Sequence, residues 1–349
     1  MQPADARDIA RGPIPRSANG WLRYVERALL VAGLGLFGVL FYDVGPAAVL
    51  LNIRMAGWGI LLVVSQELLA YVCNTLGWWY AFPAPGPRVE FRRLMAARIA
   101  GDAVNYVTPT ATLGGEFVRV RMLRTGVAAT PVVASVAIAK LSQTVAQMVF
   151  VVAGLAIVLR AMPLPPPLRH GLLASLVVMA AVAVPLFIAQ RRGLSTPLVR
   201  VLNAIGFPVA ARAVAGRLRR LDDEIASFHA AGTAGFVRSM ACFFVGWTLG
   251  VVEVSLALFL LHIPLTFERV LVIEILSTTI DAILFFVPGK VGTQEGGKVL
   301  IFTMLGLDPA QGLSFAIMRR IREMTWAAIG FVILSRDARR AARAPVVAT

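Results

Sequence analysis

Long apolar segments recur along the chain, separated by shorter stretches in which arginine, glycine and proline collect. A helix that crosses a bilayer needs about 20 consecutive, mainly apolar residues. The segments that meet this requirement each predict a membrane-spanning helix. They are residues 28–45, 57–80, 131–159, 168–190, 237–262 and 310–335.

Two further apolar segments, 94–124 and 270–306, are broken near their middles by proline and glycine. The breaks read NYVTPTATLGGE, which contains Pro109, and LFFVPGKVGTQEGG, which contains Pro288. Each half has roughly 15 residues, which is too short to cross a bilayer. Two short helices around a break predict a re-entrant hairpin, whose broken backbone is tolerated only where protein or a polar cavity satisfies it. The expected fold is therefore an all-α polytopic membrane protein with about six full transmembrane helices and two re-entrant helical hairpins.

The composition excludes a soluble globule and a disordered chain. Apolar residues make up 58% of the 349 residues and charged residues only 15%, whereas soluble domains have about 45–50% and about 25%. The net charge of +15 would suit nucleic-acid binding, but the arginines cluster between apolar runs, which indicates cytoplasmic loops beside anionic lipid. We expect no nucleic-acid partner. Most arginines then lie on one side, which predicts a multi-pass protein with both termini in the cytoplasm. No small-residue cleavage site follows the first apolar run, so we expect that run to be a retained helix.

The two broken segments align at an offset of 179 residues, which places Asp102 on Asp281 and Arg119 on Lys298. The same offset places Pro109 on Pro288, Glu116 on Glu295 and Lys140 on Arg319. Three crossings separate equivalent positions, and an odd number of crossings inverts the second unit relative to the first. Inverted repeats with discontinuous helices are typical of secondary transporters, whose substrate site lies near the middle of the membrane between the repeats.

These elements divide the chain into successive parts. They are a cytoplasmic arm (1–27), a first transmembrane helix and loop (28–56), repeat 1 (57–159), a linking helix with a basic cytoplasmic loop (160–236), repeat 2 (237–335) and a cytoplasmic tail (336–349). The loop contains the amphipathic stretch GRLRRLDDEIASF, which predicts a surface helix on anionic lipid. A docking site for a partner protein is the alternative interpretation.

Ionisable residues at membrane depth need a partner or a role, because each costs about 2.5–3.5 kcal/mol to insert. Where a helix restarts after a break, its free N–H groups and positive dipole end form an anion site, and a lipid phosphate suits such a site. The residues expected to bind the lipid headgroup are Lys140, Arg319, Arg322, Gly114, Gly115, Gly289 and Gly292. The acids expected to brace the hairpin tips or to relay protons are Asp102, Glu116, Asp281, Glu295 and Glu323.

Plainer explanations apply to the same residues. Ion pairs within one helix, such as Arg319 with Glu323, would neutralise charge without a ligand. Asp102 and Asp281 would brace the hairpins by hydrogen bonds, and the prolines and glycines would form packed kinks. The three histidines and two cysteines show no metal-ligand or disulfide pattern, so we expect no metal. The sequence also has no Gly-x-Ser-x-Gly, P-loop or dinucleotide-binding motif, so we expect no cofactor and no catalytic residue.

The hairpins carry a likeness to a known family. The stretches NYVTPTATLGGEFVRVRML, FFVPGKVGTQEGG and RRIREMTWAAIGF resemble the flippase-like membrane family related to the transmembrane half of lysylphosphatidylglycerol synthases. Its Pro-Gly-x-x-Gly-x-x-Glu element is matched by Pro288, Gly289, Gly292 and Glu295. The stretch QELLAYVCNTLGWWYAF resembles a branch of the family encoded near hopanoid-synthesis genes. The resemblance implies a bacterial inner-membrane protein that moves a lipid between leaflets. The aminoacyl-transferase domain of the synthases has no counterpart in this sequence, so lysine transfer is not expected.

The expected function is thus a lipid transporter that moves an anionic or isoprenoid-type lipid, with no covalent chemistry. A membrane enzyme, or an accessory subunit in headgroup transfer or in hopanoid or glycolipid synthesis, is the alternative. A scaffold that docks through residues 191–236 is a third hypothesis. A homo-oligomer and a lipid-synthesis enzyme as partner are both left open.

Overall fold

The computed structural model describes residues 46–83, 89–107, 113–123, 129–161, 208–283 and 292–343, together with scattered positions within 39–42 and 166–203. Several predictions fall outside these residues. They concern the arm 1–27, nearly all of the span 28–45, much of the span 168–190, and Pro109, Pro288 and Gly289 at the breaks.

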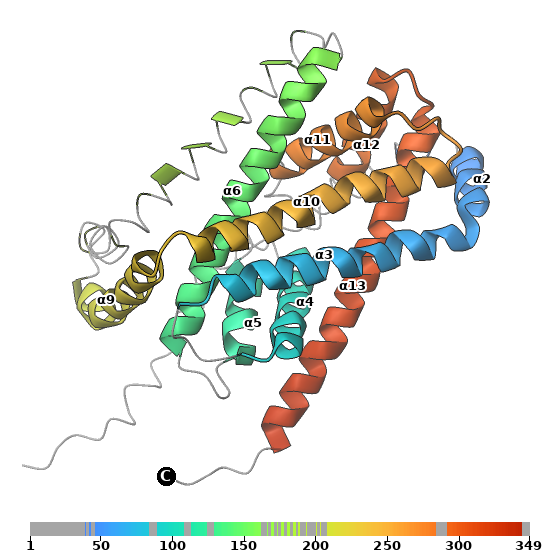
Figure 1. Cartoon of the computed structure of the whole chain (residues 1–349). Helices are drawn as coiled ribbons and strands as arrows, with labels where there is room; N and C mark the ends of the chain where they lie inside the picture. Colours follow the sequence, from blue (N-terminus) through green and yellow to red (C-terminus); the bar gives the residue numbers. More distant parts are fainter. Residues whose placement is uncertain are drawn as a thin grey trace, which may run out of the picture.

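The described part of the chain is helical and contains no strand. Its α-helices are α2 (Pro46–Ala56), α3 (Ile60–Tyr80), α4 (Phe91–Val107), α5 (Leu113–Leu123), α6 (Ala129–Ala161), α9 (Pro208–Ala230), α10 (Ala234–Leu260), α11 (Phe267–Ile283), α12 (Thr293–Met304) and α13 (Pro309–Arg343). The predicted all-α class is therefore confirmed (Figure 1).

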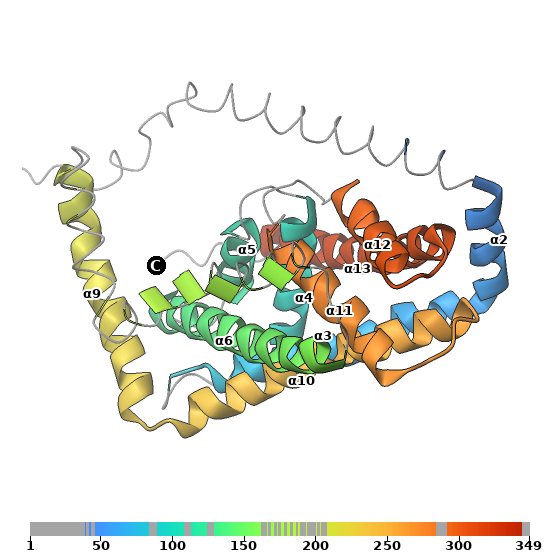
Figure 2. The same ribbon diagram turned by 90° about the horizontal axis from the view of Figure 1, so that it is seen from above.

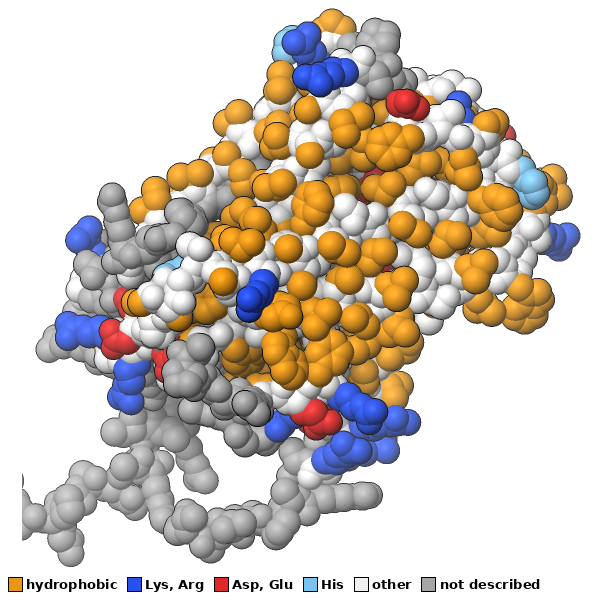
Figure 3. All heavy atoms as spheres, viewed as in Figure 1, with side chains coloured by type: hydrophobic (Ala, Val, Ile, Leu, Met, Phe, Trp, Pro, Cys, Tyr) orange, Lys and Arg blue, Asp and Glu red, His pale blue; other side chains and the backbone are white. Residues whose placement is uncertain are grey.

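Among the described residues, three helical stretches are long and apolar enough to cross a membrane: Pro46–Tyr80, Ala129–Arg160 and Ala234–Leu260. They contain most or all of the predicted spans 57–80, 131–159 and 237–262. Figure 3 shows hydrophobic side chains over much of one face, with Lys and Arg mostly near its margins. Since water disfavours so large an apolar surface, this face fits contact with lipid.

Two helices differ from the prediction. Residues 46–56, assigned from the sequence to a loop, form α2, which begins at Pro46, a favoured first helical residue. A short 3₁₀ turn at Gly57–Gly59 joins it to α3, and Gly57 adopts a φ of 49° where the chain changes direction (Figure 1). The predicted span 310–335 lies within α13, but this charged helix is not one of the three apolar stretches.

Both broken segments form a pair of helices packed against each other, α4 with α5 and α11 with α12. The first pair is antiparallel, because Asn105 near the end of α4 meets Gly115 near the start of α5, while Arg93 near the start of α4 meets Met122 near the end of α5. The prediction of two separate helices in each segment is confirmed. The residues at the breaks, 108–112 and 284–291, lie outside the described part.

The two long helices α3 and α10 run side by side, as Figures 1 and 2 both show. Small residues bring them together: the Ser239 hydroxyl donates to the carbonyl of Gly77 at 2.7 Å, and Gly77 leaves no room for a Cβ beside Phe243. Helix α13 packs against both α4 and α12. The candidate site lies between α3, α6, α10, α11 and α13.

A close approach of two backbones fixes the first hairpin. A Cβ added to Gly115 would meet the Gly101 carbonyl oxygen and the Asn105 side chain. We expect Gly115→Ala to destabilise the protein by about 1–3 kcal/mol, because backbone cannot give way as a flexible side chain can. The measurement is the thermal unfolding midpoint of purified protein in detergent.

The matched control is Gly216→Ala in α9. A Cβ at Gly216 would meet nothing within 4 Å, and alanine favours an exposed helix interior by roughly 0.8–1.0 kcal/mol over glycine. The control should therefore keep or raise the midpoint. An unchanged midpoint in the Gly115 variant would contradict the close packing of α4 on α5.

Candidate functional site

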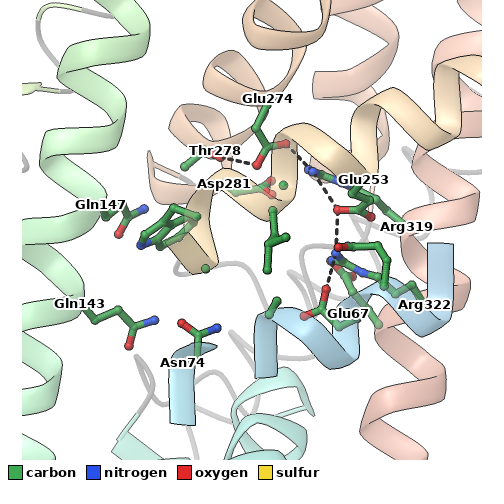
Figure 4. Close-up of a pocket in the computed structure, with 17 residues that line it drawn as sticks. Glu67, Asn74, Gln143, Gln147, Glu253, Glu274, Thr278, Asp281, Arg319 and Arg322 are labelled. Atoms are coloured by element: carbon green, nitrogen blue, oxygen red, sulfur yellow. Dashed lines mark hydrogen bonds and ion pairs between the residues drawn. The ribbon is translucent and has the colours of Figure 1, made fainter. Parts of the chain in front are cut away.

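A cavity of about 270 Å³ lies between α3, α6, α10, α11 and α13. Its lining is mainly polar, although these helices are largely apolar. The charged and amide side chains that line it are Gln66, Glu67, Asn74, Gln143, Gln147, Glu253, Glu274, Asp281, Arg319, Arg322 and Glu323. Figure 4 shows Asn74, Gln143 and Gln147 on one side of the cavity and the charged groups on the other.

Arg319 and Arg322 hold the charged side of the cavity together (Figure 4). The Arg319 guanidinium pairs with Glu274 of α11 and lies 3.1 Å from Glu253 of α10. One nitrogen of Arg322 donates to Glu67 of α3 at 2.8 Å and to Glu253 at 2.7 Å. The two arginines therefore join α13 to three other helices.

These pairs change the expected role of the two arginines. The sequence predicted that Arg319 and Arg322 would hold a lipid phosphate, but each is already engaged by two carboxylates. A phosphate would have to displace Glu253 or a neighbouring acid from the guanidinium. In this conformation each guanidinium is charge-paired, which lowers the cost of burying it.

A second cavity of about 150 Å³ lies beside the first, between α3, α4 and α13. Glu67, Arg322 and Glu323 line both cavities, so these three side chains form the partition between them. Asp102 and Tyr106 of α4 line only the second cavity. The first hairpin thus reaches the same polar interior as the second.

Arg320 connects the two hairpins. Its guanidinium donates to the Tyr106 hydroxyl at 3.0 Å near the end of α4, and to Glu295 at 2.5 Å at the start of α12. Glu323 lies 3.9 Å away on the same helix. Arg320 was not among the predicted site residues, yet it connects the end of α4 and the start of α12 to one point on α13.

Each hairpin carries an internal ion pair at the same spacing. Asp102 accepts from Arg119 at 2.5 Å in the first hairpin, and Asp281 lies 3.3 Å from Lys298 in the second. Both pairs are 17 residues apart. Each aspartate therefore pairs with a cation on the second helix of its own hairpin, and the offset that aligned the aspartates from the sequence also aligns their partners.

The first hairpin gathers further cations around its acids. Glu116 accepts from Arg119 at 2.6 Å and lies 3.7 Å from Lys140 on α6. Arg98 lies 3.8 Å from Asp102 and over the Phe243 ring, 5.4 Å from its centre. Arg98 and Arg119 were not predicted as site residues; their position on an arginine-bearing face beside the break was the available signal.

The helix tips differ from the sequence-based expectation of open N–H groups. The Gly115 N–H donates to Asn105 Oδ1 at 2.7 Å, and the Gly292 N–H donates to Glu295 Oε2 at 2.7 Å. Gly292 has a φ of 76°, which glycine adopts without strain. These two amides already have acceptors, so they are not open to a phosphate. Gly114 also lies in the first turn of α5.

Comparison with known proteins identifies one family. The model of the family described as "Lysylphosphatidylglycerol synthase TM region" matches residues 27–330. The match therefore includes α2 to α12, both hairpins, and α13 as far as Gly330. Neither the curated proteins nor the solved structures provide a match.

Proposed function

This chain belongs to the family of the lysylphosphatidylglycerol synthase TM region, and from that premise we propose that it moves a lipid between the two leaflets of a bacterial inner membrane. The lipid headgroup would pass through the polar cavity while the acyl or isoprenoid chains stay in the bilayer. Family membership itself supports a membrane protein with a lipid-related role.

The observation that carries the proposal is the polar cavity of about 270 Å³ inside an apolar chain. Six carboxylates and four cations gather around it and the adjoining tips. They are Glu67, Glu253, Glu274, Asp281, Glu295, Glu323, Lys298, Arg319, Arg320 and Arg322. Such residues are costly at membrane depth, and by default they mark the path of a polar substrate.

Lys140 is the best placed residue to receive a headgroup phosphate. Its side chain is 40% exposed, more than any other cation of the ion pairs described here. Gln143 and Gln147 follow it on α6 at helical spacing and line the cavity. A phosphate at Lys140 would therefore stand at the start of a polar path. It would compete with Glu116, which lies 3.7 Å from Lys140, but it would not need to displace the acids from Arg319 and Arg322.

The two hairpins would provide the gates. The order of helix, hairpin and helix in α3–α6 recurs in α10–α13, which supports the inverted repeat. In such an arrangement one re-entrant hairpin faces each side of the membrane, and the substrate path opens to the two sides in turn. Arg320 would hold both tips in the closed state through Tyr106 and Glu295.

The distribution of arginine supports an orientation with both termini in the cytoplasm. Helix α9 is the amphipathic element expected from the 191–236 segment. We propose that it lies on the anionic lipid of the cytoplasmic leaflet. Deleting it would test the alternative that this segment docks a lipid-synthesis enzyme.

The proposed activity needs no covalent step. The described carboxylates of the cavity are engaged by arginines or lysine rather than set around an open reacting centre. A membrane enzyme or accessory subunit remains the competing hypothesis, and it predicts a chemically altered lipid after incubation with purified protein.

Reconstitution tests the proposal directly. Purified protein in vesicles should move fluorescent analogues of anionic or isoprenoid-type lipids between leaflets, measured as the fraction of label that dithionite bleaches from outside over time. Protein-free vesicles give the background rate. Background rates for every such lipid, or a new lipid product by mass spectrometry, would contradict the transporter assignment.

A further inference from the structure

One guanidinium at the cavity serves three carboxylates. Nη1 of Arg322 lies 2.8 Å from Oε2 of Glu67 on α3 and 2.7 Å from Oε2 of Glu253 on α10. Figure 4 shows these two side chains meeting at the guanidinium. Glu323 lies 3.7 Å from Nη2 of the same arginine. The two carboxylate oxygens that share Nη1 are therefore close neighbours.

Glu67 has the fewest cations of the three acids. Glu253 also lies 3.1 Å from Arg319. Glu323 also lies 3.9 Å from Arg320. Within the described part of the chain, the shared guanidinium is the one ion-pair partner of Glu67. The negative charge of Glu67 is therefore compensated less than that of its two neighbours.

Other charges near Glu67 do not change this balance. Titratable side chains line the two cavities on α3 and on the helices packed against it. Besides Glu67, they are Arg319, Arg322 and Glu323 of α13, Glu253 of α10, Asp102 and Tyr106 of α4, and Tyr71 of α3. The cavity residues of α6 are amides, which do not titrate. The cations beside the first hairpin tip pair with the acids of that hairpin, so they leave Glu67 to Arg322.

We propose that Glu67 binds the proton that drives lipid movement, an inference that rests on the proposed function. Carboxylates that share one cation repel each other, and a proton on one of them removes the repulsion. An ionised carboxylate is also costly at membrane depth, and Glu67 lies within the apolar stretch Pro46–Tyr80, which is long enough to cross a membrane. Water in the cavities reaches this acid more readily than Glu253, because their side chains are 22% and 1% exposed.

The position of Glu67 links the proton to the path of the headgroup. Glu67 lines both cavities, and with Arg322 and Glu323 it forms the partition between them. A proton taken from water in one cavity would neutralise the carboxylate and weaken its ion pair with Arg322, which loosens the partition. Release of the proton to water in the other cavity would restore the ion pair. No other bond forms or breaks in this cycle.

The protonated acid can be detected without transport. Infrared difference spectra of the purified protein between mildly acidic and mildly alkaline pH should contain the carbonyl band of a neutral carboxyl group, and Glu67→Gln should remove that band. Glutamine still offers an acceptor to Arg322, so the variant should fold. The matched control is Glu323→Gln at the same partition, whose side chain is 21% exposed and which should keep the band. A band that survives Glu67→Gln, or that Glu323→Gln removes instead, would overturn the assignment.

Labelling of the wild-type protein gives a second test that needs no variant. A carbodiimide that dissolves in the micelle reacts with protonated carboxyl groups, and mass spectrometry of the peptides identifies the labelled acids. As the pH falls, Glu67 should be labelled before Glu253 and Glu323. Labelling of either of those two acids ahead of Glu67 would count against the proposal.

The outcomes also separate this inference from the proposed function. In vesicles, an imposed gradient of about one pH unit should shift the distribution of labelled lipid between the leaflets by up to about tenfold at one proton per lipid. Glu67→Gln should lose this response, and a protonophore should abolish it in the wild type. A protonated Glu67 without lipid movement would keep the proton site and reject the transporter. Lipid movement that ignores the gradient would overturn Glu67 as the site of the driving proton.

Discussion

Replacing Arg319 with methionine is expected to lower the free energy of unfolding by about 3–5 kcal/mol, the cost of removing one partner from a buried ion pair. Arg319 and Glu274 are 6% and 4% exposed and pair directly. Without the guanidinium, the one hydrogen bond that Glu274 keeps among the described residues is the one its Oε1 accepts from Thr278 at 3.2 Å. Glu253 loses less, since Arg322 still contacts it at 2.7 Å.

The double variant Arg319→Met with Glu274→Gln is the matched control. It removes both charges of the pair, so most of the lost stability should return, as buried ion pairs exchanged for neutral groups of similar volume often cost little. Denaturation in mixed detergent micelles gives the free energies, and the two single variants complete a double-mutant cycle. Equal losses in the single and double variants would show that Arg319 acts through something other than this pair.

The hairpins could be predicted because their signals are local. Proline and glycine interrupt apolar segments at 94–124 and 270–306, and the structure has two packed helices in each. The repeat offset also placed Asp102 opposite Asp281 and Arg119 opposite Lys298. It did not reveal that these residues pair within each hairpin, because the pairing depends on how the chain folds back at the break.

The contact partners of Arg319, Arg320 and Arg322 could not be predicted from the sequence. Successive residues of an α-helix point about 100° apart, so neighbours on α13 meet different helices. Arg319 contacts α10 and α11, Arg320 contacts the two hairpin ends, and Arg322 reaches α3. The offset from Lys140 selects Arg319, yet the residue that contacts Glu295, the counterpart of Glu116, is Arg320.

The acidity of the cavity was also not evident from the sequence. Glu67 and Glu253 stand alone within apolar helices, so each was visible as a costly buried charge. Whether Glu67 and Glu253 face the same cavity depends on how α3 packs against α10. No local sequence pattern encodes that packing. The sequence therefore suggested a phosphate between arginines, whereas the folded chain surrounds those arginines with carboxylates.

Replacing Arg320 with glutamine is expected to reduce lipid movement by about 5–150-fold, the range of typical coupling free energies of about 1–3 kcal/mol. If lipid passes by alternate opening of the two hairpins, the movements of the hairpins must be coupled. A residue that contacts both hairpins provides such coupling. Arg320 meets this requirement, because it contacts Tyr106 at 3.0 Å and Glu295 at 2.5 Å. Glutamine removes the charge and cannot reach both partners with a rigid guanidinium fork.

Two controls make this result specific. Arg339→Gln alters an exposed arginine on the same helix and should leave the rate unchanged. Arg320→Lys keeps the charge but not the fork, so its rate should lie between those of the wild type and the glutamine variant. The rates are measured in vesicles with equal amounts of folded protein. In the hydrogen bonds and ion pairs of this structure, no other described side chain contacts both Tyr106 and Glu295. A wild-type rate in Arg320→Gln would therefore mean that α13 does not couple the movements of the two hairpins.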